Sequence, residues 1–160
     1  MRTGITGHQN LGPSENIDRV VAAMNSLVEQ CGVTEGFTSL ARGADQLYAK
    51  ILCQRSVPYT VVIPCANYAS LFTSTFDRNC FEELLEAASQ TITLPFPEPS
   101  ELAFYGAGKK IVEMSEMIIA AWDGKPAKGL GGTGDIVEYA LKKGRKVMHI
   151  YPDTGEVREI

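Results

Sequence analysis

The sequence lacks any apolar run approaching the roughly 18 residues that a membrane-spanning helix requires. It also lacks a hydrophobic leader, because the first residues, Met1-Arg2-Thr3-Gly4-Ile5, have the pattern of a strand rather than of a signal peptide. We therefore expect a cytoplasmic protein that has no membrane partner.

Metal-ligating residues are scarce. The chain has 2 histidines and 4 cysteines, and none of the cysteines forms a C-x-x-C pair. A zinc site would have to draw on distant residues, so we expect no metal centre. Cys31, Cys53 and Cys80 lie among apolar neighbours, a setting typical of buried free thiols rather than of metal ligands or disulfide partners.

A basic excess is absent as well. Lys and Arg number 15 against 19 Asp and Glu, which gives a net charge of −4. Proteins that bind polyanions usually carry a strong basic excess, so we expect no nucleic-acid polymer among the partners. With 160 residues, 44% hydrophobic and 21% charged, and with no repeat or linker, the composition is typical of a single domain spanning 1–160.

Short β-branched runs alternate with segments of helical periodicity along the whole chain. The expected strands are 2–6, 35–40, 59–63, 91–94, 117–122, 147–151 and an edge strand or tail at 156–160; the expected helices are 17–28, 44–55, one ending near 88, 103–114 and 135–143. The run 117–122 is almost wholly apolar, as expected for a strand covered on both faces. The alternation predicts an α/β fold: a doubly wound, mostly parallel sheet sandwiched by helices.

In such a sheet, ligands bind beyond the carboxyl ends of the strands, where the strand order reverses. The first candidate loop there is Thr6-Gly7-His8-Gln9. Its small residues allow a tight turn, and its amides and side chains can face an anion. The alternative is an ordinary strand-to-helix turn that carries a surface histidine.

The second candidate loop runs from Ser39 to Asp45. Gly43 opens the following helix, whose N-terminus favours negative charge. Ser39 or Arg42 can therefore meet a phosphate, while Asp45 can accept hydrogen bonds from ribose hydroxyls. Alternatively, Asp45 only stabilises the start of its helix.

The third candidate loop is rich in glycine and enters a helix. Its candidate ligand-binding residues are Asp123, Lys125, Gly131, Gly132, Thr133, Gly134 and Glu138. Bare backbone amides at a helix start can wrap phosphate oxygens, and Glu138 follows one turn later. A flexible surface loop is the alternative. Trp122, Tyr68 and Phe76 are each either core residues or walls of a base pocket.

These loops resemble known motifs. Gly131-Gly132-x-Gly134-x-x-x-Glu138 is similar to the motif of the lonely-guy (LOG) phosphoribohydrolases, and Ser39-Leu40-Ala41-Arg42-Gly43-Ala44-Asp45 resembles a run in DprA-type proteins. With Gly7-His8-Gln9 and the Trp122-to-Thr133 core, the chain resembles the SLOG superfamily over nearly its whole length. The resemblance implies a Rossmann-like nucleotide-binding domain and a homodimer or higher homo-oligomer.

The chain departs from the LOG pattern in residues that matter for catalysis. It has Leu130 in place of proline and Asp135 in place of threonine, and 104–108 lacks the arginine that works with the loop glutamate. Lys109 and Lys110 follow that stretch, but lysine lacks the planar fork of arginine. Whether the chain is an enzyme is therefore left open.

The leading hypothesis is a domain that binds a nucleotide or a nucleotide-derived small molecule, for example a signalling nucleotide, and requires no other cofactor. The first alternative is an N-glycosidase of nucleoside 5′-monophosphates with Glu138 and Asp45 as catalytic carboxylates. The second is a carrier of a phosphorylated cofactor such as molybdopterin.

Overall fold

A single mixed sheet of seven strands organises the fold in a computed structural model that describes residues 1–160. The strands are β1 (Arg2–Gly7), β2 (Glu35–Thr38), β3 (Tyr59–Ile63), β4 (Gln90–Thr93), β5 (Met117–Ala121), β6 (Lys146–Ile150) and β7 (Val157–Glu159). The helices are α1 (Ser14–Gln30), α2 (Ala44–Gln54), α3 (Thr75–Glu86), α4 (Glu101–Met114) and α5 (Thr133–Lys142), with a 3-10 turn, η1 (Tyr68–Leu71). The order is β4-β3-β2-β1-β5-β6-β7, and only β7 is antiparallel to its neighbour.

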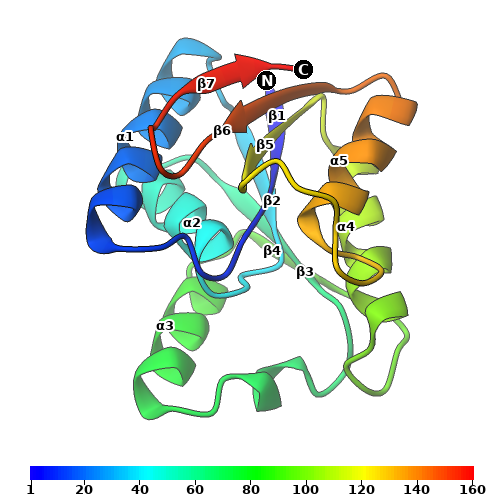
Figure 1. Ribbon diagram of the computed structural model, residues 1–160. Coiled ribbons are helices and arrows are strands. Elements are labelled where there is room, and N and C mark those ends of the chain that lie inside the picture. Colours follow the sequence, from blue (N-terminus) through cyan, green and yellow to red (C-terminus); the bar gives the residue numbers. More distant parts are fainter.

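Helices cover both faces of this sheet. Helices α1, α2 and α3 lie on one face and α4 and α5 on the other (Figure 1). Side chains of β5 alternate between the two layers: Met117 and Ile119 pack under the first, and Ile118 and Ala120 under the second. All five residues of β5 are buried, as are all five of β3. The predicted doubly wound, mostly parallel α/β sandwich is confirmed.

Helices α1, α4 and α5 begin two or three residues earlier than their periodicity predicts. Helix α1 starts at Ser14, and Ile17, expected on its apolar face, is 38% exposed because Val20 and Met24 define the buried side. Helix α5 starts at Thr133 rather than at 135. Gly132 directly before it is extended, with φ −68° and ψ 169°, so the turn ends one residue before the helix.

The prediction of three buried thiols is wrong. Cys53 is exposed, and Cys31 and Cys80 are only half-buried, whereas Cys65 is the buried one. On α2, Ile51 and Leu52 pack toward the sheet, so the next residue falls on the outer side. All four thiols are free. No helix has the length and apolarity that crossing a membrane would require.

The strand order reverses at β1. Strands β2, β3 and β4 follow outward on one side of it, and β5 and β6 lie on the other. The last residues of β1 and β5, Gly7 and Ala121, are paired in register, so the loops that follow these strands leave the sheet side by side. The fold therefore brings the three candidate loops to one edge of the sheet.

Candidate functional site

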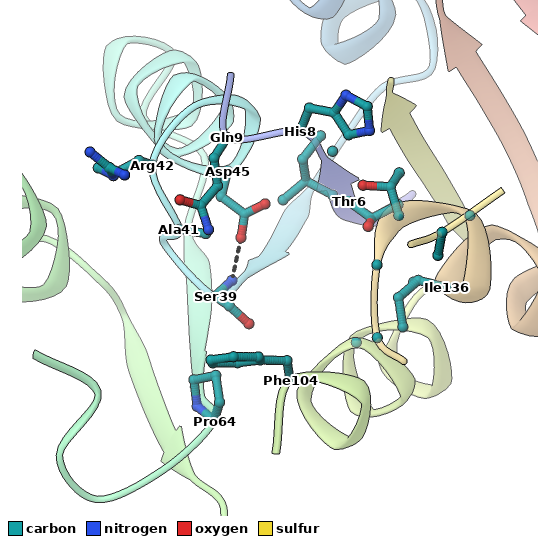
Figure 2. Close-up of a pocket in the computed structure, with 18 of the residues that line it drawn as sticks. Thr6, His8, Gln9, Ser39, Ala41, Arg42, Asp45, Pro64, Phe104 and Ile136 are labelled. Carbon is teal, nitrogen blue, oxygen red and sulfur yellow. Dashed lines mark hydrogen bonds between the residues drawn. The ribbon is translucent and has the colours of Figure 1, made fainter. Parts of the chain in front are cut away.

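A cavity of about 730 Å³ opens at this edge of the sheet, between the ends of β1, β2 and β3 and the starts of α4 and α5. Figure 2 shows side chains from both sides of the sheet facing this space. Twelve of the residues singled out in the sequence line it: Thr6, Gly7, His8, Gln9, Ser39, Arg42, Asp45, Lys125, Gly131, Gly132, Thr133 and Gly134. Three loops that are far apart in the sequence thus share one cavity.

Three other residues singled out in the sequence do not line the cavity: Gly43, Asp123 and Glu138. Gly43 has φ +81°, and a Cβ there would lie 2.4 Å from the carbonyl oxygen of Gln9, so it is a packing position. The Asp123 carboxylate lies 3.9 Å from Nε2 of His8, between the ends of β1 and β5.

Glu138 lies on the outer side of α5. Its carboxylate is 2.6 Å from the Nζ atom of Lys142, one turn along the helix, and its side chain is 64% exposed. The hydrogen bond from Lys142 holds the pKa of Glu138 below its usual value. The structure therefore does not bring the two proposed catalytic carboxylates, Glu138 and Asp45, together.

The loop between β2 and α2 is closed by Asp45. Its Oδ2 atom accepts a hydrogen bond from the backbone N–H of Ser39, at 3.0 Å (Figure 2). It also accepts one from the hydroxyl of Thr38, at 3.2 Å. Burial raises the pKa of this carboxyl to about 6, although these hydrogen bonds and one from the backbone of Ala41 oppose the shift. Because Asp45 takes the Ser39 amide, that N–H group is not free for a phosphate.

The glycine loop, by contrast, leaves amides free at the start of α5. The N–H of Gly131 donates to Oδ2 of Asp135 at 3.0 Å, and that of Gly132 makes a long bond of 3.4 Å to the carbonyl of Gly129. The N–H groups of Thr133 and Gly134 have no acceptor in the protein. Both residues line the cavity at the positive end of the helix dipole.

Two lysines flank these free amides. Lys125 and Lys128 line the cavity, are exposed and take part in no ion pair. Arg42, on the opposite side, is already 3.3 Å from the Asp77 carboxylate. The available positive charge therefore lies beside the start of α5.

Trp122, a buried residue directly after β5, anchors the glycine loop. Its indole N–H donates to the carbonyl of Lys125 at 2.9 Å, and its ring lies against His149 with centroids 3.9 Å apart. The ring is 6% exposed and does not line the cavity. Of the two roles left open for Trp122, the structure supports the core residue.

The apolar wall of the cavity was largely missed from the sequence. It includes Pro64 and Phe72, which follow β3, together with Phe104, Ile111 and Ile136 from α4 and α5. Tyr68 also lines the cavity, whereas Phe76 does not and is 75% exposed. The spacing of 104, 108 and 111 on one helical face was the signal for α4, but only the sheet order shows which face meets the cavity.

No protein-family model matches the sequence, and no curated protein matches it significantly. Solved structures match its fold. DNA processing protein A (DprA) from Streptococcus pneumoniae matches with a TM-score of 0.68 at 15% identity, over 94% of this chain and 50% of that one. DNA processing protein A from Helicobacter pylori, described with a single-stranded DNA binding mode, matches with 0.66 at 14% identity, over 93% and 64%.

A third structure, TM1055, a structural genomics target, matches with a TM-score of 0.56 at 13% identity, over 91% of this chain and 71% of that one. The chain therefore spans only about half to two thirds of the two DprA proteins. At these identities the likeness shows the fold, and the DprA-like, Rossmann-like fold implied by the SLOG resemblance is confirmed.

The comparison corrects one prediction. The expectation of no nucleic-acid polymer among the partners is wrong as an inference from charge, because the H. pylori protein of the same fold binds single-stranded DNA. The net charge of −4 averages over the whole surface. It does not describe the cavity edge, where Lys125 and Lys128 have no acidic partner.

Proposed function

We propose that the protein binds a nucleotide or a nucleotide-derived small molecule in the cavity at the carboxyl edge of the sheet. One observation carries the proposal: Thr133 and Gly134, whose N–H groups have no acceptor in the protein, line a cavity that aromatic and apolar side chains also line. A nucleotide has the same two-ended character, with an anionic phosphate and a flat base.

The phosphate end is formed at the start of α5. Two free amides and the helix dipole supply hydrogen bonds and partial positive charge, and Lys125 and Lys128 add full charges. Gly134 lets the backbone of Lys125 and Ala127 pack closely against the start of α5, because a Cβ there would lie 3.0 Å from the backbone nitrogen of Ala127.

The base end is formed by the apolar wall of the cavity. Phe104 is 36% exposed, and its ring, which is seen edge-on in Figure 2, lies near Pro64 and Ser39. An exposed aromatic face of this kind offers a base a stacking surface. A volume of about 730 Å³ falls within the range of cavities that hold small organic ligands.

Hydrolysis of the ligand is supported less well than binding. Cleavage of a glycosidic bond in this cavity needs a carboxylate beside the sugar and a phosphate anchor. Glu138 is paired with Lys142 outside the cavity, which leaves Asp45 as the carboxylate inside it. We therefore place binding ahead of N-glycosidase activity.

Single-stranded DNA is a second candidate ligand, favoured by the fold shared with a protein that binds it. The cavity is open at the sheet edge, so one nucleotide of a strand can occupy it while Lys125 and Lys128 meet neighbouring phosphates. A phosphorylated cofactor such as molybdopterin would use the same anchors, and a purified protein carrying it would absorb at longer wavelengths than protein does.

Calorimetric titration with AMP, ADP, ADP-ribose, inorganic phosphate and an oligothymidylate tests the proposal. We expect AMP to bind, and Lys125→Ala to weaken its binding by about tenfold because a charge-assisted contact is lost. Lys143→Ala removes an equal charge at the far end of α5 and is the matched control. A folded protein that gives no heat with any of these ligands contradicts the proposal.

A further inference from the structure

Tyr68 differs from the other fully buried tyrosines in its hydroxyl. The residue is 5% exposed and lines the cavity, and its hydroxyl makes no hydrogen bond within the protein; unlike the unpaired Nε atom of Arg145, this oxygen is not sealed from solvent. The hydroxyl of Tyr48 bonds to Thr3, and that of Tyr59 bonds to the carbonyl of Leu84. Buried tyrosine hydroxyls normally have such a partner. The Tyr68 hydroxyl therefore retains its hydrogen-bonding capacity for something in the cavity.

Packing, not hydrogen bonding, fixes the ring of Tyr68. The ring meets Phe72 edge-on with centroids 5.5 Å apart and Phe81 with centroids 5.7 Å apart. Phe72 and Phe81 are themselves stacked at 4.3 Å, so the cluster is rigid. The hydroxyl is thus held in place at the cavity wall before any ligand arrives.

The Asp45 carboxyl lines the same cavity. Burial, and after it the charge of Asp45, raises the pKa of the Tyr68 hydroxyl, so the phenol stays protonated and can donate. The Oδ2 atom of Asp45 is oriented by Ser39 and Thr38. A fixed donor and a fixed acceptor therefore line the same cavity as the start of α5.

We propose that Tyr68 and Asp45 form a second polar anchor that binds a hydroxyl of the ligand, and that Tyr68 determines specificity for ligands carrying it. This inference rests on the proposed function. A sugar hydroxyl donates its proton to the carboxylate and accepts one from the phenol, so it satisfies both groups at once. A ligand that covers the Tyr68 hydroxyl without offering a hydroxyl in return leaves the phenol unpaired and binds less tightly.

Three ligands and three proteins test the anchor by calorimetry: AMP, 2′-deoxy-AMP and 3′-deoxy-AMP against wild type, Tyr68→Phe and Tyr139→Phe. We expect wild type to bind AMP about tenfold more tightly than one deoxy analogue. Tyr68→Phe is expected to bind AMP about tenfold more weakly than wild type does, and to bind the same analogue almost as tightly as wild type does. Tyr139→Phe removes a hydroxyl that bonds to Glu113 outside the cavity and should leave all three affinities unchanged.

The outcomes separate the two proposals. If Tyr68→Phe weakens all three ligands equally, or weakens none of them, the anchor is overturned while nucleotide binding stands. If wild-type protein binds none of the three ligands, the result contradicts both the proposed function and the proposed anchor.

Discussion

The carboxylate of Asp45 accepts a hydrogen bond from the backbone N–H of Ser39 over 3.0 Å, and only 7% of the Asp45 residue remains exposed. This bond closes the loop between β2 and α2 on itself. The Ser39 amide is therefore taken by the protein, whereas the N–H groups of Thr133 and Gly134 at the start of α5 have no acceptor. Because Lys125 and Lys128 line the same cavity without an acidic partner, we expect the anionic end of a bound ligand to lie beside α5.

Asp45 makes stability depend on pH. Its pKa is about 6 in the folded protein, against 3.8 for the free side chain, so the folded state holds the proton more tightly. Its contribution is fully present below about pH 4 and is lost as pH rises through 6. We expect a fall of up to about 3 kcal/mol in the free energy of unfolding, since each pKa unit between the folded and unfolded states is worth ~1.4 kcal/mol.

The Asp45→Asn variant isolates this effect. Its amide oxygen can still accept from the Ser39 N–H, but it does not ionise. Urea unfolding of both proteins at several pH values should show the variant gaining stability relative to wild type between pH 4 and 6. A difference that stays constant over this range would mean that Asp45 ionises normally in the folded protein.

Two tyrosine substitutions should differ in their effects on stability. Tyr48→Phe removes a buried hydroxyl bonded to Thr3, and we expect a loss of about 1–3 kcal/mol. Tyr68→Phe removes a hydroxyl with no partner, so the free energy of unfolding should stay the same or rise. Thermal or urea unfolding without ligand measures both. Equal losses would show that the Tyr68 hydroxyl has a structural role.

Gly43 is expected to be intolerant of substitution. Its φ is +81°, and a Cβ would lie 2.4 and 2.5 Å from the carbonyl oxygens of Gln9 and His8. Gly43→Ala should therefore cost at least ~3 kcal/mol, through strain and displacement of the loop after β1. Gly144, with φ +66° and no atom within 4 Å of an added Cβ, is the matched control.

In the control, Gly144→Ala should cost only about 1–2 kcal/mol for the left-handed backbone. Denaturant unfolding of the two variants compares the costs directly. If Gly43→Ala is no more destabilising than Gly144→Ala, the close contact between the first two candidate loops is not what holds that edge together.

Glu138 should be dispensable. Its carboxylate pairs with Lys142 on the outside of α5, so Glu138→Gln is expected to change AMP affinity by less than about twofold. Chromatography of protein incubated with nucleoside 5′-monophosphates gives the second readout. Release of free base by wild type, abolished in Glu138→Gln, would restore the N-glycosidase hypothesis and contradict the placement of this residue.

The sequence predicts much of the fold because its signals are local. The five-residue strand 59–63 was predicted with exact bounds, since Pro64 ends an apolar β-branched run. The strand-order rule then indicated which loops meet, and twelve of the predicted residues do line one cavity. Both inferences need only periodicity, turn residues and the handedness of parallel connections.

What the sequence could not provide is the direction and pairing of individual groups. Glu138 follows the glycine loop by one turn, but its pairing with Lys142 outside the cavity emerges only with the helix in place. The sequence predicts that Ser39 or Arg42 meets a phosphate, yet Asp45 takes the Ser39 amide and Arg42 pairs with Asp77. The unpartnered hydroxyl of Tyr68 depends on the packing of Phe72 and Phe81 around it.

The AMP affinity of Thr133→Pro, compared with that of Thr133→Val, tests the free amides at the start of α5 most directly. Proline suits the first helical position, and Gly132 before it already has the extended backbone that proline requires, so the helix should be retained while one N–H is lost. Thr133→Val keeps the N–H and removes only the hydroxyl. We predict that calorimetry shows AMP binding at least about tenfold weaker for Thr133→Pro than for Thr133→Val. Equal affinities in two folded variants would contradict the account.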